Sequence, residues 1–277
     1  MRVMWKGAIL FGLVSIPVGL YPATEEKAVH FHQLHGEDGA RIRYQKVCSL
    51  DGQEVGPDNI VRGYELRKDE YVIVTDEELA ALPVQSTRAI EIQQFVDIAE
   101  IDPVYFQRSY YLAPEAPGVK PYRLLAQVMQ DDGRVAVAKI ALREKEHLAV
   151  IRAHDGVLML ETMFWPDEIR SPAFEDLDGD IQVREQEVAM AKSLIANLTE
   201  AWDPAAYHDD YRAQLLDLIE RKAAGEAIVA TPQARPAKVI DLMEALKASV
   251  EASAERRQKA QSQRAGSPEG LTSIRLP

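Results

Sequence analysis

The sequence of 277 residues is poor in cysteine, with Cys48 as its single one. One cysteine excludes an internal disulfide and suits a reducing compartment. Long apolar runs are also missing, because crossing a bilayer as a helix takes about 20 consecutive apolar residues. The apolar stretch at residues 4–21 is interrupted by glycine and proline and lacks a small-x-small cleavage site. We therefore expect a cytoplasmic protein with no membrane partner.

The motifs of common enzyme classes are absent too. There is no G-x-x-x-x-G-K-[ST] loop for a nucleoside triphosphate, no GxGxxG between a strand and a helix, and no G-x-S-x-G elbow. KVCSLDG comes nearest to the Lys-x-Asp-Gly motif of nucleotidyl transferases, but its spacing is wrong. We expect no enzymatic activity and no cofactor, and a hydrolase or nucleotide-dependent enzyme on a β-rich core is the opposing hypothesis.

One candidate for a metal site is the stretch HFHQLH, with His30, His32 and His35. Two of these histidines would share a face of a strand, as pairs of metal ligands do. The single cysteine and the lack of suitably spaced carboxylates favour histidines that pack or form hydrogen bonds. We expect no bound metal, and no nucleophilic role for Cys48, which has no visible activating partner.

Charge is unevenly distributed along this acidic chain, whose net charge is −12. From Ala230 onward there are eight basic and five acidic side chains, a net +3, which leaves 24 basic and 39 acidic side chains and a net −15 before it. Nucleic-acid-binding proteins are usually basic. If this chain binds DNA, it must gather its positive charge in one place.

The first 165 residues predict mostly strands. We expect strands in residues 8–21, 71–75, 89–98, 109–114 and 135–142, with a hairpin in 148–163 around Asp155-Gly156. Two helices interrupt them. Residues 76–83 follow Thr75 with Glu78 in capping-box position, and the second helix occupies 120–133. The mixture indicates a barrel or sandwich with helical insertions.

After Pro166 the pattern becomes helical. Residues 185–198 have apolar side chains at helical spacing. Asp203-Pro204 predicts the start of a second helix that ends at Gly225. Residues 231–236 form a proline-containing linker, and 239–261 predict a marginal amphipathic helix followed by disorder.

A basic ribbon stands out near the N-terminus, where GARIRYQKVC places Arg41, Arg43 and Lys46 within a few residues. In extended conformation Arg41 and Arg43 point the same way, and VRGYELRK at 61–68 supplies a second charged segment that could pair with it. Guanidinium groups at alternate positions suit phosphates. The alternative is a solvated hairpin whose arginines pair with nearby carboxylates, namely Glu37, Asp38, Asp51 and Glu54.

The sequence as a whole closely resembles bacterial Ku, the DNA-end-binding protein of non-homologous end joining. The resemblance covers roughly residues 1–228. It rests on blocks in order along the chain: MWKGAILFGLVSIPVGLYPAT, FHQLH, IRYQKVC, DNIVRGYE, YVIVTDEELAAL, EIDPVYF, YYLAP, VAVAKIALREKEHLAVIR, LMLETM, MAKSLIANL and WDPAAYHDDYRAQLLDLIE. A second cysteine after Cys48 is missing, so no zinc site is carried over to that position.

The resemblance implies an α+β fold, with a β-barrel core, a long projecting β-ribbon or bridge, and C-terminal helices. Two subunits would form a ring that threads duplex DNA. We expect the core in residues 1–184, with the bridge at about 36–67. Residues 185–229 would be the helical C-terminal part of the core, and 230–277 a flexible, partly helical basic tail. The protein would be cytoplasmic and associated with the nucleoid.

A ring of this kind would place cations on its inner wall and carboxylates outside. Our candidates for DNA contact are the cations on or near the bridge and on the AKIALR strand: Lys27, Arg41, Arg43, Lys46, Arg62, Lys139 and Arg143. Lys139 interrupts an apolar run, which favours a wall position because burying a lysine is costly, and an ion pair is its alternative role. Arg143 is followed by Glu144 and Glu146, so ion pairing competes there too.

The tail is expected to contact a partner. The resemblance implies a homodimer and a multifunctional ATP-dependent DNA repair ligase as partners. The apolar stripe at 240–250 and a basic cluster of Arg256, Arg257, Lys259 and Arg264 are the candidates for recruiting that ligase. An unstructured solubilising tail is one alternative. The alternative for the whole protein is an interaction scaffold that acts through the C-terminal helix without threading DNA.

Overall fold

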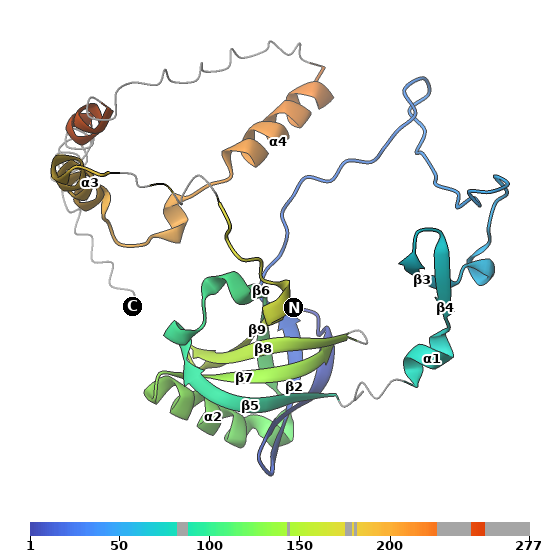
Figure 1. Cartoon of the computed structure of the whole chain (residues 1–277), viewed down its shortest axis with the longest axis horizontal. Helices are drawn as coiled ribbons and strands as arrows, with labels where there is room; N and C mark the ends of the chain where they lie inside the picture. The colour runs from blue at the N-terminus through green and yellow to red at the C-terminus, as the bar shows by residue number, and fades with distance from the viewer. Residues whose placement is uncertain (82–87, 143–144, 175–178, 180–181, 226–244, 253–277) are drawn as a thin grey trace, which may run out of the picture. The chain divides into compact units, whose positions relative to one another are not determined.

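The computed structural model describes the chain except residues 82–87, 143–144, 175–178, 180–181, 226–244 and 253–277 (Figure 1). The chain divides into two compact units, Met1–Pro172 and Ala173–Pro277. None of the helices in the described residues has the length and apolar character needed to cross a membrane.

The first unit contains a closed barrel of seven strands in the order β1-β2-β6-β9-β8-β7-β5. All neighbours are antiparallel except β1 and β5, which pair in parallel and close the barrel. The predicted strands and barrel core are confirmed. The strands are β1 (Trp5–Phe11), β2 (Val14–Pro22), β5 (Ala89–Asp97), β6 (Phe106–Pro114), β7 (Arg134–Leu142), β8 (Lys145–His154) and β9 (Val157–Met163).

The barrel forms because each strand sends apolar side chains inward. Ile9, Leu20, Ile90, Leu112 and Ile140 are completely buried, and each comes from a different strand. Between β8 and β9 the predicted hairpin is confirmed. Asp155 and Gly156 have φ angles of 50° and 76°, the left-handed conformation that a two-residue type I′ turn requires.

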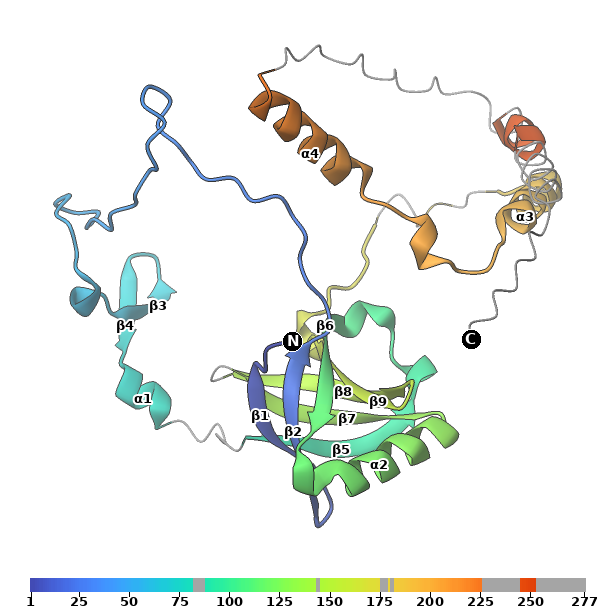
Figure 2. The ribbon, with the colours of Figure 1, turned by 180° about the vertical axis from the view of Figure 1, so that it is seen from behind.

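Helix α2 (Val119–Asp131) confirms the helix predicted at 120–133 and packs alongside the barrel (Figure 2). Tyr122 fixes it there. Its hydroxyl donates a 2.6 Å hydrogen bond to the Leu112 carbonyl and accepts a 2.7 Å bond from the Leu158 amide. Burial raises the pKa of Tyr122, so the neutral phenol that makes both bonds is the stable form.

Between β2 and β5 the chain makes an excursion that we call the arm, residues 24–80. No residue of the arm is buried. It contains η1 (Pro57–Asn59), β3 (Arg62–Arg67), β4 (Glu70–Val74) and α1 (Asp76–Ala80). The capping box predicted between Thr75 and Glu78 is present at the start of α1.

The predicted pairing of 39–48 with 61–68 is wrong. Strand β3 pairs instead with β4, through Arg62↔Val74 and Tyr64↔Val72. The cause is the two-residue turn Lys68-Asp69, in which Asp69 has a φ of 64°. A local hairpin closes a far shorter loop than a pairing across the arm, so it costs less chain entropy.

The second unit has α3 (Glu185–Leu198) where a helix was predicted, and α4 (Asp210–Ala223). Asp203-Pro204 does not start α4, as we had predicted, but caps the single turn η7 (Pro204–Ala206). Asp209 is the true N-cap of α4, because its carboxylate accepts the Arg212 amide. Gly225, with a φ of 79°, follows the end of α4 as predicted.

Residues 245–252 are helical, and the rest of the predicted helix 239–261 lies outside the described residues. Four single turns complete the structure around the barrel: η2 (Ile98–Glu100), η3 (Pro103–Tyr105), η4 (Ala116–Gly118) and η5 (Pro166–Glu168).

Candidate nucleic-acid interface

The basic stretch of the arm is held between two tight turns. The first joins Leu34 to Arg41 by an isolated bridge, with the His35 amide donating to the Ala40 carbonyl at 2.8 Å. The second joins Val47 to Glu54, and inside it the Cys48 amide donates to the Gln53 carbonyl at 2.8 Å. Residues 42–46 connect the two turns without being part of a strand.

Arg41, Arg43 and Lys46 are free cations. Within the described part of the chain, none of the three has a side-chain hydrogen bond or an ion pair. All three are exposed. The segment therefore presents three positive charges to solvent, and none of them stabilises the described part of the fold through an ion pair.

Three of the four neighbouring carboxylates, Asp38, Asp51 and Glu54, are engaged elsewhere. Asp51 accepts the amide of Gln53 at 3.1 Å, and Glu54 accepts the side-chain amide of Gln45 at 3.4 Å. The pKa of the Asp38 carboxyl is held below its usual value by a hydrogen bond from the Ala40 backbone amide and, to a smaller extent, by one from the His35 side chain. The alternative of a hairpin whose arginines pair with these carboxylates is not what the structure shows.

The other described candidates each have one acidic partner. Lys27 lies 2.6 Å from Glu25, Arg62 lies 3.2 Å from Asp76, and Lys139 lies 3.1 Å from Glu146. Lys139 also sits 5.5 Å from the centre of the Trp165 ring. These pairs are substantially exposed, and exposed ion pairs contribute little stability, so a phosphate could replace the carboxylate.

Four of the predicted contacts in the tail, Arg256, Arg257, Lys259 and Arg264, lie outside the described residues, as does Arg143. No group of three or more His, Cys, Asp and Glu side chains in the described parts of the chain could hold a metal ion. His35, from the histidine-rich stretch, instead lies 3.0 Å from Asp38.

Sequence reasoning missed the apolar surface of the β3–β4 hairpin. Tyr64 and Val72 face each other on one side of the hairpin, and Ile73 lies on the other side. Tyr64 is 67% exposed and Ile73 58%. A two-stranded hairpin with neither face covered is marginal by itself. The alternating sequence had identified these strands, but only the pairing showed that both faces stay uncovered.

Comparison with known proteins gives the family. The sequence model of the Ku70/Ku80 β-barrel domain matches residues 10–190, which is more than half of the chain. The chain belongs to the Ku family. The match covers the end of β1, the barrel strands from β2 to β9, the whole arm and the beginning of α3, so the free cations of the arm lie within the Ku region.

Individual Ku relatives agree. A protein of Frankia casuarinae named non-homologous end joining protein Ku is 49% identical over 253 residues, 91% of this chain. The aligned part is 64% of that relative, so this chain spans less than two thirds of its length. Proteins of the same name from Desulfitobacterium hafniense and Mycobacterium tuberculosis are 44% and 40% identical, over 94% and 91% of the chain and 90% and 96% of their own length.

Proposed function

We propose that the chain binds double-stranded DNA ends without sequence preference, as a homodimeric ring in non-homologous end joining, and performs no catalytic step itself. The names of its relatives support the pathway. The single observation that carries DNA binding is the set of unpaired cations Arg41, Arg43 and Lys46 on an arm without buried residues.

The charge distribution suits this role. Free guanidinium groups bind phosphate oxygens bidentately and read no bases. Residues 1–229, which include the arm, carry a net −15, so the acidic surface away from the free cations would repel DNA that approaches elsewhere. Binding would therefore be confined to the place where the cations gather.

The β3–β4 hairpin supports the dimer. Both of its faces expose large apolar side chains, which a second copy of the chain would cover. Two arms that cover each other would enclose a space with free cations from both copies. Such an opening fits a duplex entered from its end.

Linear and closed circular duplexes of the same sequence distinguish threading from side binding. We expect the chain to shift the linear form in a gel and to leave the intact circle free. Because the affinity comes from counterion release, binding should fall by about 10³-fold or more between 50 and 200 mM salt. Equal binding to both forms would contradict the ring, and no binding at low salt would favour the scaffold alternative.

We further propose that residues 230–277 recruit a multifunctional ATP-dependent DNA repair ligase. The support is the net +3 of this segment and its apolar stripe at 240–250. A chain that ends at residue 229 should bind linear DNA as the full chain does, but should stimulate end joining by the ligase several-fold less. Undiminished stimulation in a ligation time course would remove the tail from this role.

A further inference from the structure

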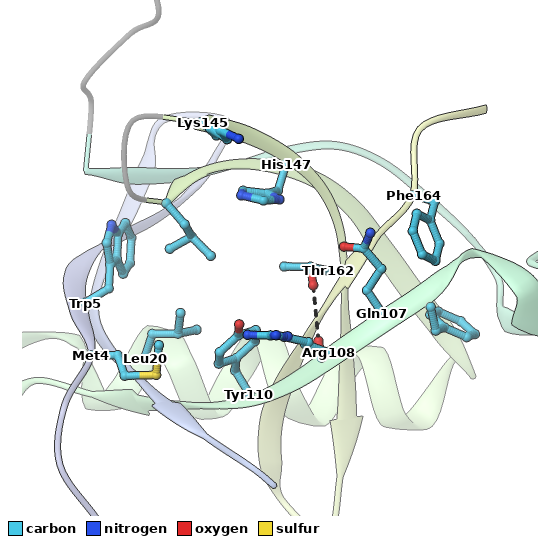
Figure 3. A pocket seen from close by; sticks show the side chains of 12 residues that line it. Met4, Trp5, Leu20, Gln107, Arg108, Tyr110, Lys145, His147, Thr162 and Phe164 are labelled. Atoms are coloured by element: carbon cyan, nitrogen blue, oxygen red, sulfur yellow. Dashed lines mark hydrogen bonds between the residues drawn. The ribbon is translucent and has the colours of Figure 1, made fainter. Parts of the chain in front are cut away.

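One end of the barrel contains a hollow of about 750 Å³, shown in Figure 3. It is lined by residues from the beginnings of β1, β6 and β8 and from the ends of β2, β7 and β9. At this end β2 leads into the arm. The last residue of β2 is paired with β6 there, through Pro22↔Tyr110. The volume is that of a small-molecule site.

The hollow gathers basic side chains in an acidic protein. Arg108, Lys145 and His147 line it, and no Asp or Glu does so among the residues that the structure describes. Within the same residues, these three side chains have neither a hydrogen bond nor an ion pair. An anion that entered would therefore find donors that are not already occupied.

A break in the regular strand builds this wall. Between Phe106 and Arg108 the pairing of β6 with β9 shifts by one residue. Consecutive residues of a regular strand point to opposite faces, yet Phe106, Gln107 and Arg108 all line the hollow. Bulges at barrel rims re-aim side chains in this manner. The hydroxyl of Thr162, in β9, donates to the Arg108 carbonyl at 3.5 Å and holds the two strands together there.

Aromatic rings supply the remaining walls. Trp5 lies on one side of the hollow, Tyr110 with Arg108 across its floor, and Phe164 beyond Gln107 (Figure 3). Flat apolar surfaces beside unoccupied cations match a ligand that is itself part planar ring and part anion. Stacking on such rings tolerates any base, because every base has a π face.

We propose that this hollow binds a nucleotide, with its base against Trp5 or Tyr110 and its phosphate on Arg108 and Lys145. The same chemistry has two sources, a free nucleotide and the last nucleotide of a single-stranded overhang on a DNA end. The overhang case rests on the proposed function, and the free nucleotide does not depend on it.

Calorimetric titration of the full chain with deoxyadenosine monophosphate tests the first source. We expect saturable binding that weakens at least ten-fold in Arg108→Ala/Lys145→Ala. A matched control, Lys120→Ala/Arg123→Ala on the exposed face of α2, should bind as the unaltered chain does. Because all four side chains are exposed, circular dichroism should confirm that both variants fold.

Duplexes of one sequence, blunt or with a short single-stranded overhang, test the second source. An overhang that tightens binding by three-fold or more, with the gain lost in Arg108→Ala/Lys145→Ala, identifies the terminal nucleotide. The blunt duplex should bind that variant unchanged, so failure of this inference is distinct from failure of DNA-end binding.

Three results would overturn the proposal. The first is the absence of both nucleotide binding and any gain from the overhang. The second is inorganic phosphate binding as tightly as the nucleotide, which would indicate a simple anion site. The third is tighter binding of a short peptide of glutamate and phenylalanine than of the nucleotide, if the Arg108→Ala/Lys145→Ala variant no longer binds that peptide.

Discussion

Changing Arg41, Arg43 and Lys46 together to glutamate should abolish binding of linear duplex DNA, with a loss of at least about 100-fold in affinity. These side chains are exposed and have no partner in the described structure, so removing them breaks no internal contact. Each substitution removes one phosphate contact and adds a repulsive charge beside another phosphate. Fluorescence anisotropy with a labelled blunt duplex would measure the loss.

Net charge alone could produce part of this effect, so the control must match it. Lys120→Glu/Arg123→Glu/Arg134→Glu makes the same change in charge at three exposed positions on α2 and β7. We expect this control to keep most of its affinity. If both triple variants lose binding equally, then the arm is not the interface and general repulsion explains the result.

Changing Tyr64 and Ile73 to aspartate should convert the proposed dimer into a monomer. Because the two side chains lie on opposite faces of the β3–β4 hairpin, the double variant places a carboxylate on each face. Burying an unpaired carboxylate in an apolar interface costs more than such an interface can tolerate. Light scattering should show a fall from twice the chain mass of 31.0 kDa to the mass of one chain, and DNA-end binding should be lost with it.

The control for this prediction is Leu13→Asp/Leu124→Asp. It replaces two large exposed apolar side chains outside the arm and adds the same charge. The control should remain a dimer. A double variant of the hairpin that stays dimeric would place the subunit contact elsewhere, and the cations of the two arms would then have no reason to face a common space.

Much of the barrel could be predicted from the sequence, because its strands carry local signals. Alternation and β-branched residues marked the strands, Asp155-Gly156 marked one turn, and Thr75 with Glu78 marked the start of a helix. Where two signals competed, the prediction was wrong. Asp203-Pro204 has the features of a helix start, yet Asp209 lies closer to the apolar repeat of α4 and caps it.

The candidate site was less predictable, because it depends on which groups find partners. Arg41 and Arg62 appear equivalent in the sequence, but only Arg62 lies next to a carboxylate, that of Asp76. The alternative, in which nearby carboxylates neutralise Arg41, depended on the same choice of partners. The backbone amides of Ala40 and Gln53 occupy Asp38 and Asp51, and the Gln45 side chain occupies Glu54. The hollow at the end of the barrel gave no signal in the sequence, since it depends on a shift in register between β6 and β9.

The parallel pairing of β1 with β5 has a consequence for how this protein can vary. Strands β2 and β5, between which the arm lies, are both bound to β1. The barrel is thus complete without the arm, and lengthening the arm adds only closure entropy, about 0.6 kcal/mol for each doubling of its length. Insertions and deletions in the arm could therefore resize the proposed aperture between two copies over evolutionary time while the scaffold that anchors the arm stays constant.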